Sequence, residues 1–378
     1  MISGSPPNSC ANSSRLDRVI PYGRQHINDT DIAAVEKVLL SDWLTTGPTI
    51  EAFEEAVADY VGAEYAITFS SATAALHGSC AAAELGTGDV VFTSPLTFIA
   101  SANCARYVGA RPGLVDIDPA TLNLDMSQVD DSIEALVPVH YAGLPMELSQ
   151  LPHRPRVIIE DASHALGASS PDGRVGNCAS SDMCVFSFHP VKPITTGEGG
   201  MVTTNDPDLA QALREFRSHG IVRSSDPDSW EYDAARIGFN YRMTDIQAAL
   251  GLQQLSRIDE FIDRRNAIAD RYRDALEDLP LTLPPAAPDG FRHGYHLFAI
   301  QVPDRRRIFR ELRHRGIGVQ VHYVPVHHHT VSADIEVPAA GFPAADAAYE
   351  GLISLPIYPD LTDEQQDQVI AALKEVLA

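Results

Sequence analysis

The sequence predicts an α/β fold with a mostly parallel sheet that carries helices on both faces, followed by a smaller C-terminal α/β unit. Short apolar runs recur between residues 65 and 204, with segments of helical spacing between them. This alternation is typical of parallel sheets, whose ligands bind at the carboxyl ends of the strands. A proline-rich stretch at 279–290 precedes a second α/β pattern. Within 378 residues we expect a disordered tail (1–19), a large domain (20–260) and a small C-terminal domain (261–378).

Two helices are expected before the first strand. Asn28 can cap the first helix, in which Ile32, Val35 and Leu39 share a face. The second helix ends at Gly62. Its apolar positions follow the same spacing at Ile50, Phe53, Val57 and Tyr60.

The alternating region contains apolar runs of the kind found in strands that are buried on both faces. The expected strands are 65–69, 90–93, 113–117, 135–139, 157–159, 183–188 and 201–204, with helices at 72–85 and 97–107. Residues 244–276 have the spacing of one long helix or a broken pair. In the C-terminal unit we expect strands at 295–302, 319–323 and 352–355 and helices at 305–315 and 362–377.

The charge balance excludes some classes of partner. With 51 acidic and 28 basic side chains the formal charge is −23, which argues against binding to nucleic acid or to an anionic membrane. No apolar run approaches the length of a membrane span, and residues 1–15 lack a hydrophobic signal core. We therefore expect a cytoplasmic protein without a nucleic-acid or membrane partner.

The cysteines indicate reduced, buried thiols, because they are odd in number and lie mostly in apolar runs. Cys178 and Cys184 are close in sequence, but their spacing and the lack of a second pair argue against a zinc site. The full set is Cys10, Cys80, Cys104, Cys178 and Cys184.

Lysine is scarce, and one lysine lies in a segment suited to chemistry. Lys37 and Lys374 are on polar faces of expected helices, whereas Lys192 lies between two prolines and ahead of a glycine-rich turn. Such a setting restricts the backbone and favours a partly desolvated amine, which can act as a nucleophile. Lys192 is therefore the candidate reactive group.

Three other strand ends could hold a phosphorylated pyridine aldehyde on that amine. Residues 70–74 form a hydroxyl-rich turn into a helix, where free amides and the helix dipole can bind phosphate. Asp161 could keep a pyridine nitrogen protonated, and His164 could face the ring hydroxyl. Phe98 could stack on the ring. Each has a plain structural alternative, namely helix capping for the turn and for Asp161 and interior packing for His164 and Phe98, but together they favour a pyridoxal phosphate site.

Other motifs support competing functions less well. Residues 197–200 are glycine-rich but precede a strand, unlike a dinucleotide or Walker loop. His327, His328 and His329, with His322 nearby, could suggest metal binding. Adjacent side chains should project in different directions, and no carboxylate or cysteine completes the set, so we expect a solvated loop or substrate contacts there and no metal.

Residues 187–200 resemble the lysine motif of the DegT/DnrJ/EryC1/StrS family of nucleotide-sugar aminotransferases. The resemblance runs from about residue 20 to the C-terminus and includes the segments 20–25, 41–45, 161–167, 321–327 and 353–356. It implies a fold-type I aminotransferase with a seven-stranded, mostly parallel sheet in its large domain. It also implies that pyridoxal 5′-phosphate is the cofactor and that two subunits share each active site.

The resemblance implies a role for each candidate residue. Lys192 would carry the cofactor as an imine, Asp161 would pair with the pyridine nitrogen, and His164 would lie by the ring hydroxyl. The remaining cofactor contacts would be Ala72, Thr73, Phe98 and Ser187, with Asn240 from the neighbouring subunit. The substrate-side positions would be Tyr22, Asp42, Trp43, Leu44, Thr45, Gln320, His322 and Tyr323.

The reaction implied is transamination at C4 of a UDP-linked 4-keto-6-deoxy-N-acetylhexosamine with L-glutamate as donor. Its product would be UDP-4-amino-4,6-dideoxy-N-acetyl-β-L-altrosamine, for pseudaminic acid biosynthesis. Relatives with histidine in place of the lysine perform dehydration, so Lys192 favours transamination. One alternative is the same reaction on another UDP- or GDP-linked 4-keto-6-deoxy sugar. Two others are a non-catalytic ligand sensor on the same scaffold and an NAD-linked sugar oxidoreductase. The sequence lacks the glycine fingerprint that an NAD-linked enzyme would need.

Overall fold

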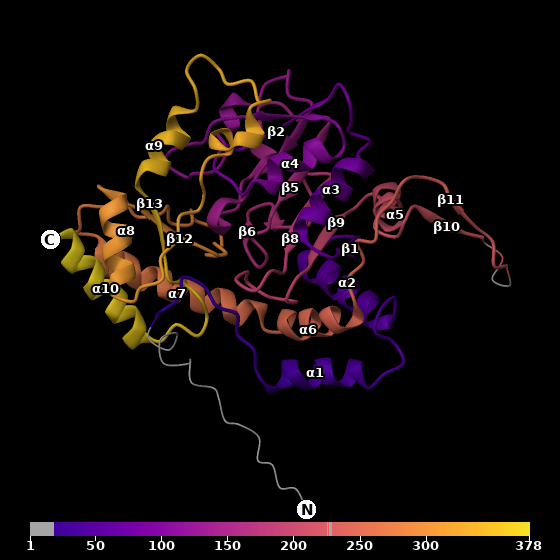
Figure 1. Cartoon of the computed structure of the whole chain (residues 1–378), viewed down its shortest axis with the longest axis horizontal. Helices are drawn as coiled ribbons and strands as arrows, with labels where there is room; N and C mark the ends of the chain where they lie inside the picture. Colours follow the sequence, from indigo (N-terminus) through magenta and orange to yellow (C-terminus); the bar gives the residue numbers. More distant parts are fainter. Residues whose placement is uncertain (1–18, 225, 227–228) are drawn as a thin grey trace, which may run out of the picture.

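A computed structural model describes residues 19–224, 226 and 229–378. The expected disordered tail, apart from Val19, lies outside the described residues, as does Cys10. Figure 1 shows a central sheet surrounded by helices, with a two-stranded hairpin that projects away from the body of the molecule. The hairpin consists of β10 (Ile221–Arg223) and β11 (Tyr232–Ala234).

The central sheet has seven strands in the order β1-β9-β8-β5-β4-β2-β3. Strand β9 runs antiparallel to β1 and to β8, and all other pairings in this sheet are parallel. The strands are β1 (Tyr65–Phe69), β2 (Val90–Thr93), β3 (Arg111–Leu114), β4 (Ala135–Val137), β5 (Val157–Asp161), β8 (Met183–Ser187) and β9 (Gly200–Thr204). The predicted fold class, with its mostly parallel sheet, is confirmed.

Successive residues of a strand point to opposite faces, and each face of this sheet is covered by helices. On one face, Cys184 and Phe186 of β8 pack into a core with α2 (Pro48–Val61), α6 (Asp245–Leu255) and the start of α7 (Ile258–Leu276). On the other face, Met183 and Val185 join a core with α3 (Ala72–Ala82), α4 (Ala100–Tyr107) and α5 (Pro207–Phe216). Burial on both sides explains why apolar residues occupy consecutive positions of β8 instead of alternating with polar ones.

A separate core holds the C-terminal unit together. Its strands β12 (Phe298–Gln301) and β13 (Leu352–Leu355) pair antiparallel and pack with α8 (Arg305–His314) and α10 (Asp363–Leu377). The last turns of α7 belong to this core and its first turns to the large-domain core, so the predicted boundary at 260–261 falls inside one helix. Ile20 also joins the C-terminal core and bridges to Ile317.

Some expected elements differ in the structure. Residues 319–323 do not form a strand. Within this segment Gln320 alone makes a β-bridge, which is an isolated one to Ser354. The expected broken pair is two helices, α6 and α7. Helices α5 and α9 (Pro343–Gly351) and the projecting hairpin had not been predicted, because their short or proline-led segments lack a long periodic pattern.

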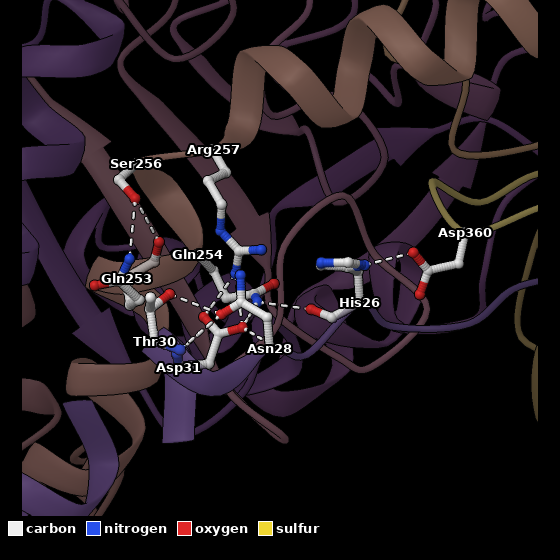
Figure 2. Close-up of polar contacts among 9 residues, drawn as sticks. All are labelled: His26, Asn28, Thr30, Asp31, Gln253, Gln254, Ser256, Arg257 and Asp360. Carbon is white, nitrogen blue, oxygen red and sulfur yellow. Dashed lines mark hydrogen bonds and ion pairs between the residues drawn. The ribbon is translucent and has the colours of Figure 1, made fainter. Parts of the chain in front are cut away.

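Helix α1 (Asp29–Leu39) is capped by Asn28 as predicted. Its packing, however, differs from the predicted apolar face. Ile32 and Leu39 are exposed, and Asp31 is the fully buried residue of the first turn. Figure 2 shows Asp31 between Gln254 and Arg257, which donate to it from the end of α6 and the start of α7. A buried ion pair, rather than an apolar stripe, therefore holds α1 to the large domain.

The same segment is tied to the C-terminal unit. Nδ1 of His26 lies 2.5 Å from Oδ1 of Asp360, and the carbonyl of His26 accepts a hydrogen bond from Gln254 (Figure 2). The chain before α1 thus contacts both α6 and the segment that precedes α10.

We predict that Arg257→Ala lowers the free energy of unfolding by about 3 kcal/mol or more, because it leaves the Asp31 carboxylate buried with only neutral donors. Urea unfolding monitored by circular dichroism measures this loss. Arg315→Ala, which breaks a solvent-exposed pair with Glu311, is the matched control and should change stability little. Equal effects of the two substitutions would contradict the role given to the buried pair.

Candidate active site

The carboxyl ends of five strands meet at one edge of the sheet. Because β1 and β8 both run against β9, they point the same way as β2, β4 and β5. Residues that follow these strands line one cavity of about 390 Å³. The cavity therefore lies where an α/β sheet is expected to bind its ligand.

Most of the predicted site residues line this cavity. Lys192 reaches it from the loop between β8 and β9, while the N-terminal segment and the C-terminal unit close it from other sides. The predicted residues that line it are Tyr22, Ala72, Thr73, Phe98, Asp161, His164, Ser187, Lys192, His322 and Tyr323.

The amine of Lys192 has a neutral partner rather than a salt bridge. Its Nζ lies 3.4 Å from Nε2 of His296. Burial lowers the pKa of Lys192 to about 8, and the Asp161 carboxylate acts in the opposite direction. Such an amine is partly unprotonated near neutral pH, as a nucleophile or base requires.

Three buried histidines surround that amine, namely His164, His296 and His322. Burial, reinforced by the nearby Lys192 cation, lowers the pKa of His164 and His296 well below the usual value. It lowers the pKa of His322 to about 3. The three rings are therefore neutral near pH 7. Among these four groups, Lys192 is the one that can carry a positive charge at that pH.

Asp161 ends β5 and is held in place by hydroxyl and amide donors. Its Oδ2 accepts from Oγ of Ser101 at 2.7 Å, and its Oδ1 accepts from the amide of Ser163 at 3.1 Å. The preceding Glu160 points to the other face of the sheet, where it pairs with His140 at 2.7 Å. The alternation of the strand therefore points Asp161, and not Glu160, into the cavity.

The turn into α3 presents free backbone N–H groups to the same space. Ser71 caps the helix by accepting from the amide of Ala74, and the first amides, of Ala72 and Thr73, have no intrahelical acceptor. A Cβ on Gly200 would lie 2.5 Å from the nitrogen of Ala72, so only glycine allows β9 to approach the turn this closely. The positive end of α3 thus faces the cavity and suits an anion.

Comparison with known proteins agrees with this geometry. A model of the DegT/DnrJ/EryC1/StrS aminotransferase family matches residues 25–374. The chain belongs to this family. It is a pyridoxal-phosphate-dependent aminotransferase, as the resemblance of the lysine motif had indicated.

Three relatives span almost the whole chain. The spore coat polysaccharide biosynthesis protein SpsC of Bacillus subtilis is 35% identical over 96% of this chain and 98% of its own. Helicobacter pylori PseC, an aminotransferase involved in the biosynthesis of pseudoaminic acid, has a TM-score of 0.87 at 30% identity, covering 95% of this chain and 99% of PseC. The PLP form of Spr1654 from Streptococcus pneumoniae, named as a sugar aminotransferase, has a TM-score of 0.86 at 29% identity, covering 95% and 100%.

The residues present fit the family's cofactor. Nδ1 of His164 and Nδ1 of His296 are buried without a hydrogen-bond partner at the cavity. A polar aromatic ligand can satisfy such atoms, the turn into α3 suits its phosphate, and the Lys192 amine suits its aldehyde.

Other predicted residues lie outside this chain's own cavity. Residues 42–45 and Gln320 are exposed and do not line it. Asn240 is also exposed, although its neighbour Tyr241 accepts a hydrogen bond from the Ser70 amide at the turn before α3. Within one chain, these positions are not brought together with Lys192.

Several cavity residues had not been predicted, among them His296 and Glu198. His296 was hidden in an expected strand, where a histidine among apolar residues was the available signal. Glu198 lies in the glycine-rich turn that precedes β9. The place of His296 and Glu198 in the cavity depends on contacts between segments that are distant in the sequence.

We predict that the cofactor-free protein binds pyridoxal phosphate covalently at a rate that rises with pH through about 8 and then levels off, because only a neutral amine attacks an aldehyde. Stopped-flow absorbance measures this rate. The Lys192→Ala variant, which keeps the exposed Lys37 and Lys374, supplies the background. A rate that keeps rising toward the pKa of an ordinary lysine, about 10.4, would contradict a desolvated amine.

We also predict that acid destabilises the cofactor-free protein through His322. Its pKa is about 3 in the folded state and about 6.5 when unfolded. Between these values the unfolded state binds the extra proton, so stability falls as pH decreases from about 6.5, by up to about 1.4 kcal/mol per pH unit.

The measurement is the slope of unfolding free energy against pH between about 4.5 and 6.5, the range in which the unfolded histidine becomes protonated. His322→Asn should reduce this slope by close to one proton. His314→Asn, at an exposed position of α8, should leave it unchanged. An unaltered slope in His322→Asn would show that this ring does not carry the effect.

Proposed function

We propose that this aminotransferase transfers an amino group from L-glutamate to C4 of a UDP-linked 4-keto-6-deoxy-N-acetylhexosamine. The product would be UDP-4-amino-4,6-dideoxy-N-acetyl-β-L-altrosamine, an intermediate of pseudaminic acid biosynthesis. The observation that carries the chemistry is the Lys192 amine, which has no salt-bridge partner, in one cavity with Asp161 and the free amides at the start of α3. The sugar class is supported by the likeness to PseC, to Spr1654 and to SpsC.

Each residue has a distinct task in this proposal. The amides of Ala72 and Thr73 and the hydroxyl of Ser187 bind the phosphate of the cofactor. Asp161 holds a proton on the pyridine nitrogen, and its fixed bonds to Ser101 and Ser163 keep it oriented. When bound, pyridoxal phosphate withdraws electrons from the carbon that carries the transferred nitrogen.

Lys192 carries protons in both halves of the reaction, as a base toward glutamate and as an acid toward the sugar. Its Nζ takes the proton from Cα of glutamate and later delivers a proton to C4 of the sugar. His296, 3.4 Å away and neutral, can accept a hydrogen bond from the ammonium or donate one to the amine. One flexible amine in a fixed setting can therefore serve both proton transfers.

Two further residues would contact the cofactor ring. Phe98 stacks on one face, and His164 lies near the ring hydroxyl. The nucleotide sugar contacts Tyr22, His322 and Tyr323, whose rings pack against one another and line the cavity.

The proposal includes a homodimer with shared active sites. Phe98 lies at the cavity yet is 55% exposed, and Trp43 is 54% exposed. A second copy would cover these side chains and would bring in residues 42–45, Gln320 and Asn240, with Asn240 on the cofactor phosphate. A cytoplasmic location is also part of the proposal, and none of the helices among the described residues has the length and apolarity of a membrane span.

The test is glutamate-dependent amination of the 4-keto UDP-sugar by purified protein, with the mass and configuration of the product determined. Lys192→Ala should lose at least about 10⁴-fold in rate, as expected when a group acting as nucleophile and base is removed, together with the visible absorbance of the bound cofactor. Lys374→Ala, which removes an exposed lysine of α10, should keep both.

Borohydride reduction provides an independent check of the lysine. With only Lys37, Lys192 and Lys374 present in the chain, mass spectrometry of peptides should locate the trapped cofactor on the peptide that contains Lys192. Cofactor trapped elsewhere, or full activity and colour in Lys192→Ala, would refute the assignment.

A second substrate is supported by the comparisons, because Spr1654 is as similar to this chain as PseC is. The alternative is C4 amination of another UDP- or GDP-linked 4-keto-6-deoxy sugar. A panel of keto sugars in the same assay separates the two, since the preferred substrate should have the highest kcat/KM. Preference for a sugar without the N-acetyl group would reject the first proposal and support the second.

A further inference from the structure

Beyond the active-site cavity, three consecutive histidines follow the Tyr323 segment and take no part in the chemistry described above. The sequence predicts no metal there, because adjacent side chains should diverge and no carboxylate accompanies them. The structure differs on both points. His327 and His328 converge, and Asp346 joins them from α9.

The three side chains form a compact set of ligand atoms. Nε2 of His327 and Nε2 of His328 each lie 2.9 Å from the same oxygen, Oδ1 of Asp346. All three ligand atoms lie within 4.8 Å of one another, which among the described residues is true of this group alone. The carboxylate is 19 positions from His327, so no local sequence motif reveals it.

The set is held by elements that are fixed independently of it. His327 and His328 belong to the short 3-10 helix η5 (Val326–His328), whose Val326 amide donates to the carbonyl of Pro95. The side chain of His327 is only 8% exposed. The ligands are therefore positioned before any ion arrives, which lowers the entropic cost of binding.

Asp346 is positioned by the start of α9. The carboxylate of Asp116 accepts from the amides of Ala344 and Ala345 at 2.9 and 3.0 Å and so caps this helix. Asp346 follows in the first turn. Its side chain is 44% exposed and that of His328 is 39% exposed, so an ion could enter from solvent.

The chemistry of the set favours a cation over a simple hydrogen-bonded cluster. The Nε2 atoms of two imidazoles lie next to one carboxylate oxygen, which places three metal-ligand atoms on one side of a shared space. Neutral imidazole nitrogen and carboxylate oxygen are common ligands of zinc and related divalent ions. The chain's formal charge of −23 also favours cations near the surface.

We propose that His327, His328 and Asp346 bind one divalent transition-metal ion of the zinc class, with water completing its coordination. The ion would join η5 to α9 and so hold the loop that follows the cavity residue Tyr323. This site is separate from the cofactor and does not depend on the proposed sugar substrate.

The affinity should be moderate. Nδ1 of His327 is buried without a partner, and coordination through Nε2 would leave its N–H without an acceptor. Metal-bound histidines usually donate that N–H, and loss of such a partner costs about 10–100-fold in affinity. With two imidazoles, one carboxylate and solvent as ligands, we expect a dissociation constant in the micromolar range.

The experiment uses the untagged enzyme with its cofactor bound, and Zn²⁺ as the probe in competition with a chromogenic chelator. We expect one saturable site per chain. His328→Gln and Asp346→Asn should each weaken it by at least about 10-fold, the lower end of the effect of losing even an outer ligand contact. His329→Gln is the matched control, because it is the third histidine of the run and belongs to no such group.

Thermal unfolding gives a second readout. Zn²⁺ should raise the melting temperature of the native protein and of His329→Gln, because an ion that binds only the folded state stabilises it. It should not do so in Asp346→Asn. Circular dichroism and bound-cofactor absorbance verify that each variant is folded.

Three outcomes would overturn the proposal. They are the absence of saturable binding, binding that survives unchanged in both His328→Gln and Asp346→Asn, and binding that His329→Gln weakens as much as the other substitutions do. None of them bears on amination of the sugar, which has its own assay.

Discussion

The desolvated amine of Lys192 is the constraint on which the rest of the active site depends. Removal from water makes its charge costly and lowers its pKa to about 8. A tight carboxylate partner would restore the charge and tie up the amine, but its hydrogen-bond partner is the neutral His296. The amine can therefore change protonation state at little cost, which proton transfer requires.

The neutral histidines follow from the same constraint. A second cation beside a desolvated ammonium would repel it with little solvent screening. The Lys192 cation is among the causes that lower the pKa of His164, His296 and His322. The site thus surrounds the amine with polar but uncharged rings. It places the Asp161 carboxylate at the end of a strand, where backbone and hydroxyl donors fix it.

The direction of β9 explains why Lys192 stays at the carboxyl edge of the sheet. A parallel crossover after β8 would carry the chain over one face to the opposite edge. Since β9 runs antiparallel to β8, the segment between Ser187 and Gly200 instead turns back at the same edge. Gly200 then meets the turn before α3 closely enough that any Cβ would collide with Ala72. One reversed strand brings Lys192 to the same cavity as the free amides at the start of α3.

Much of this could be predicted from local sequence. Continuous apolar runs identify the strands, the strand ends identify Asp161 and the turn before α3, and the isolated lysine identifies itself. The remainder depends on contacts between distant segments. His296 joins the site from the segment that precedes β12. Asp31 pairs with Arg257, which is 226 positions away in the sequence, and Asp346 meets His327 through the packing of α9. Periodicity and spacing carry no information about such pairs, so correct prediction of the central strands did not reveal them.

The positions that one chain leaves outside its own cavity follow a consistent logic. A side chain that serves a partner's site has to be exposed in the isolated subunit, because it cannot also line the cavity of its own chain. Trp43 and Leu44 are large, apolar and about half exposed, and Asn240 is exposed beside the stacked rings of Phe239 and Tyr241. Tyr241 in turn accepts a hydrogen bond from the Ser70 amide, just before the helix that faces the cavity. The loop that bears Asn240 is thereby anchored to this chain's own turn before α3, so a partner seated across it would join two active sites through one short segment.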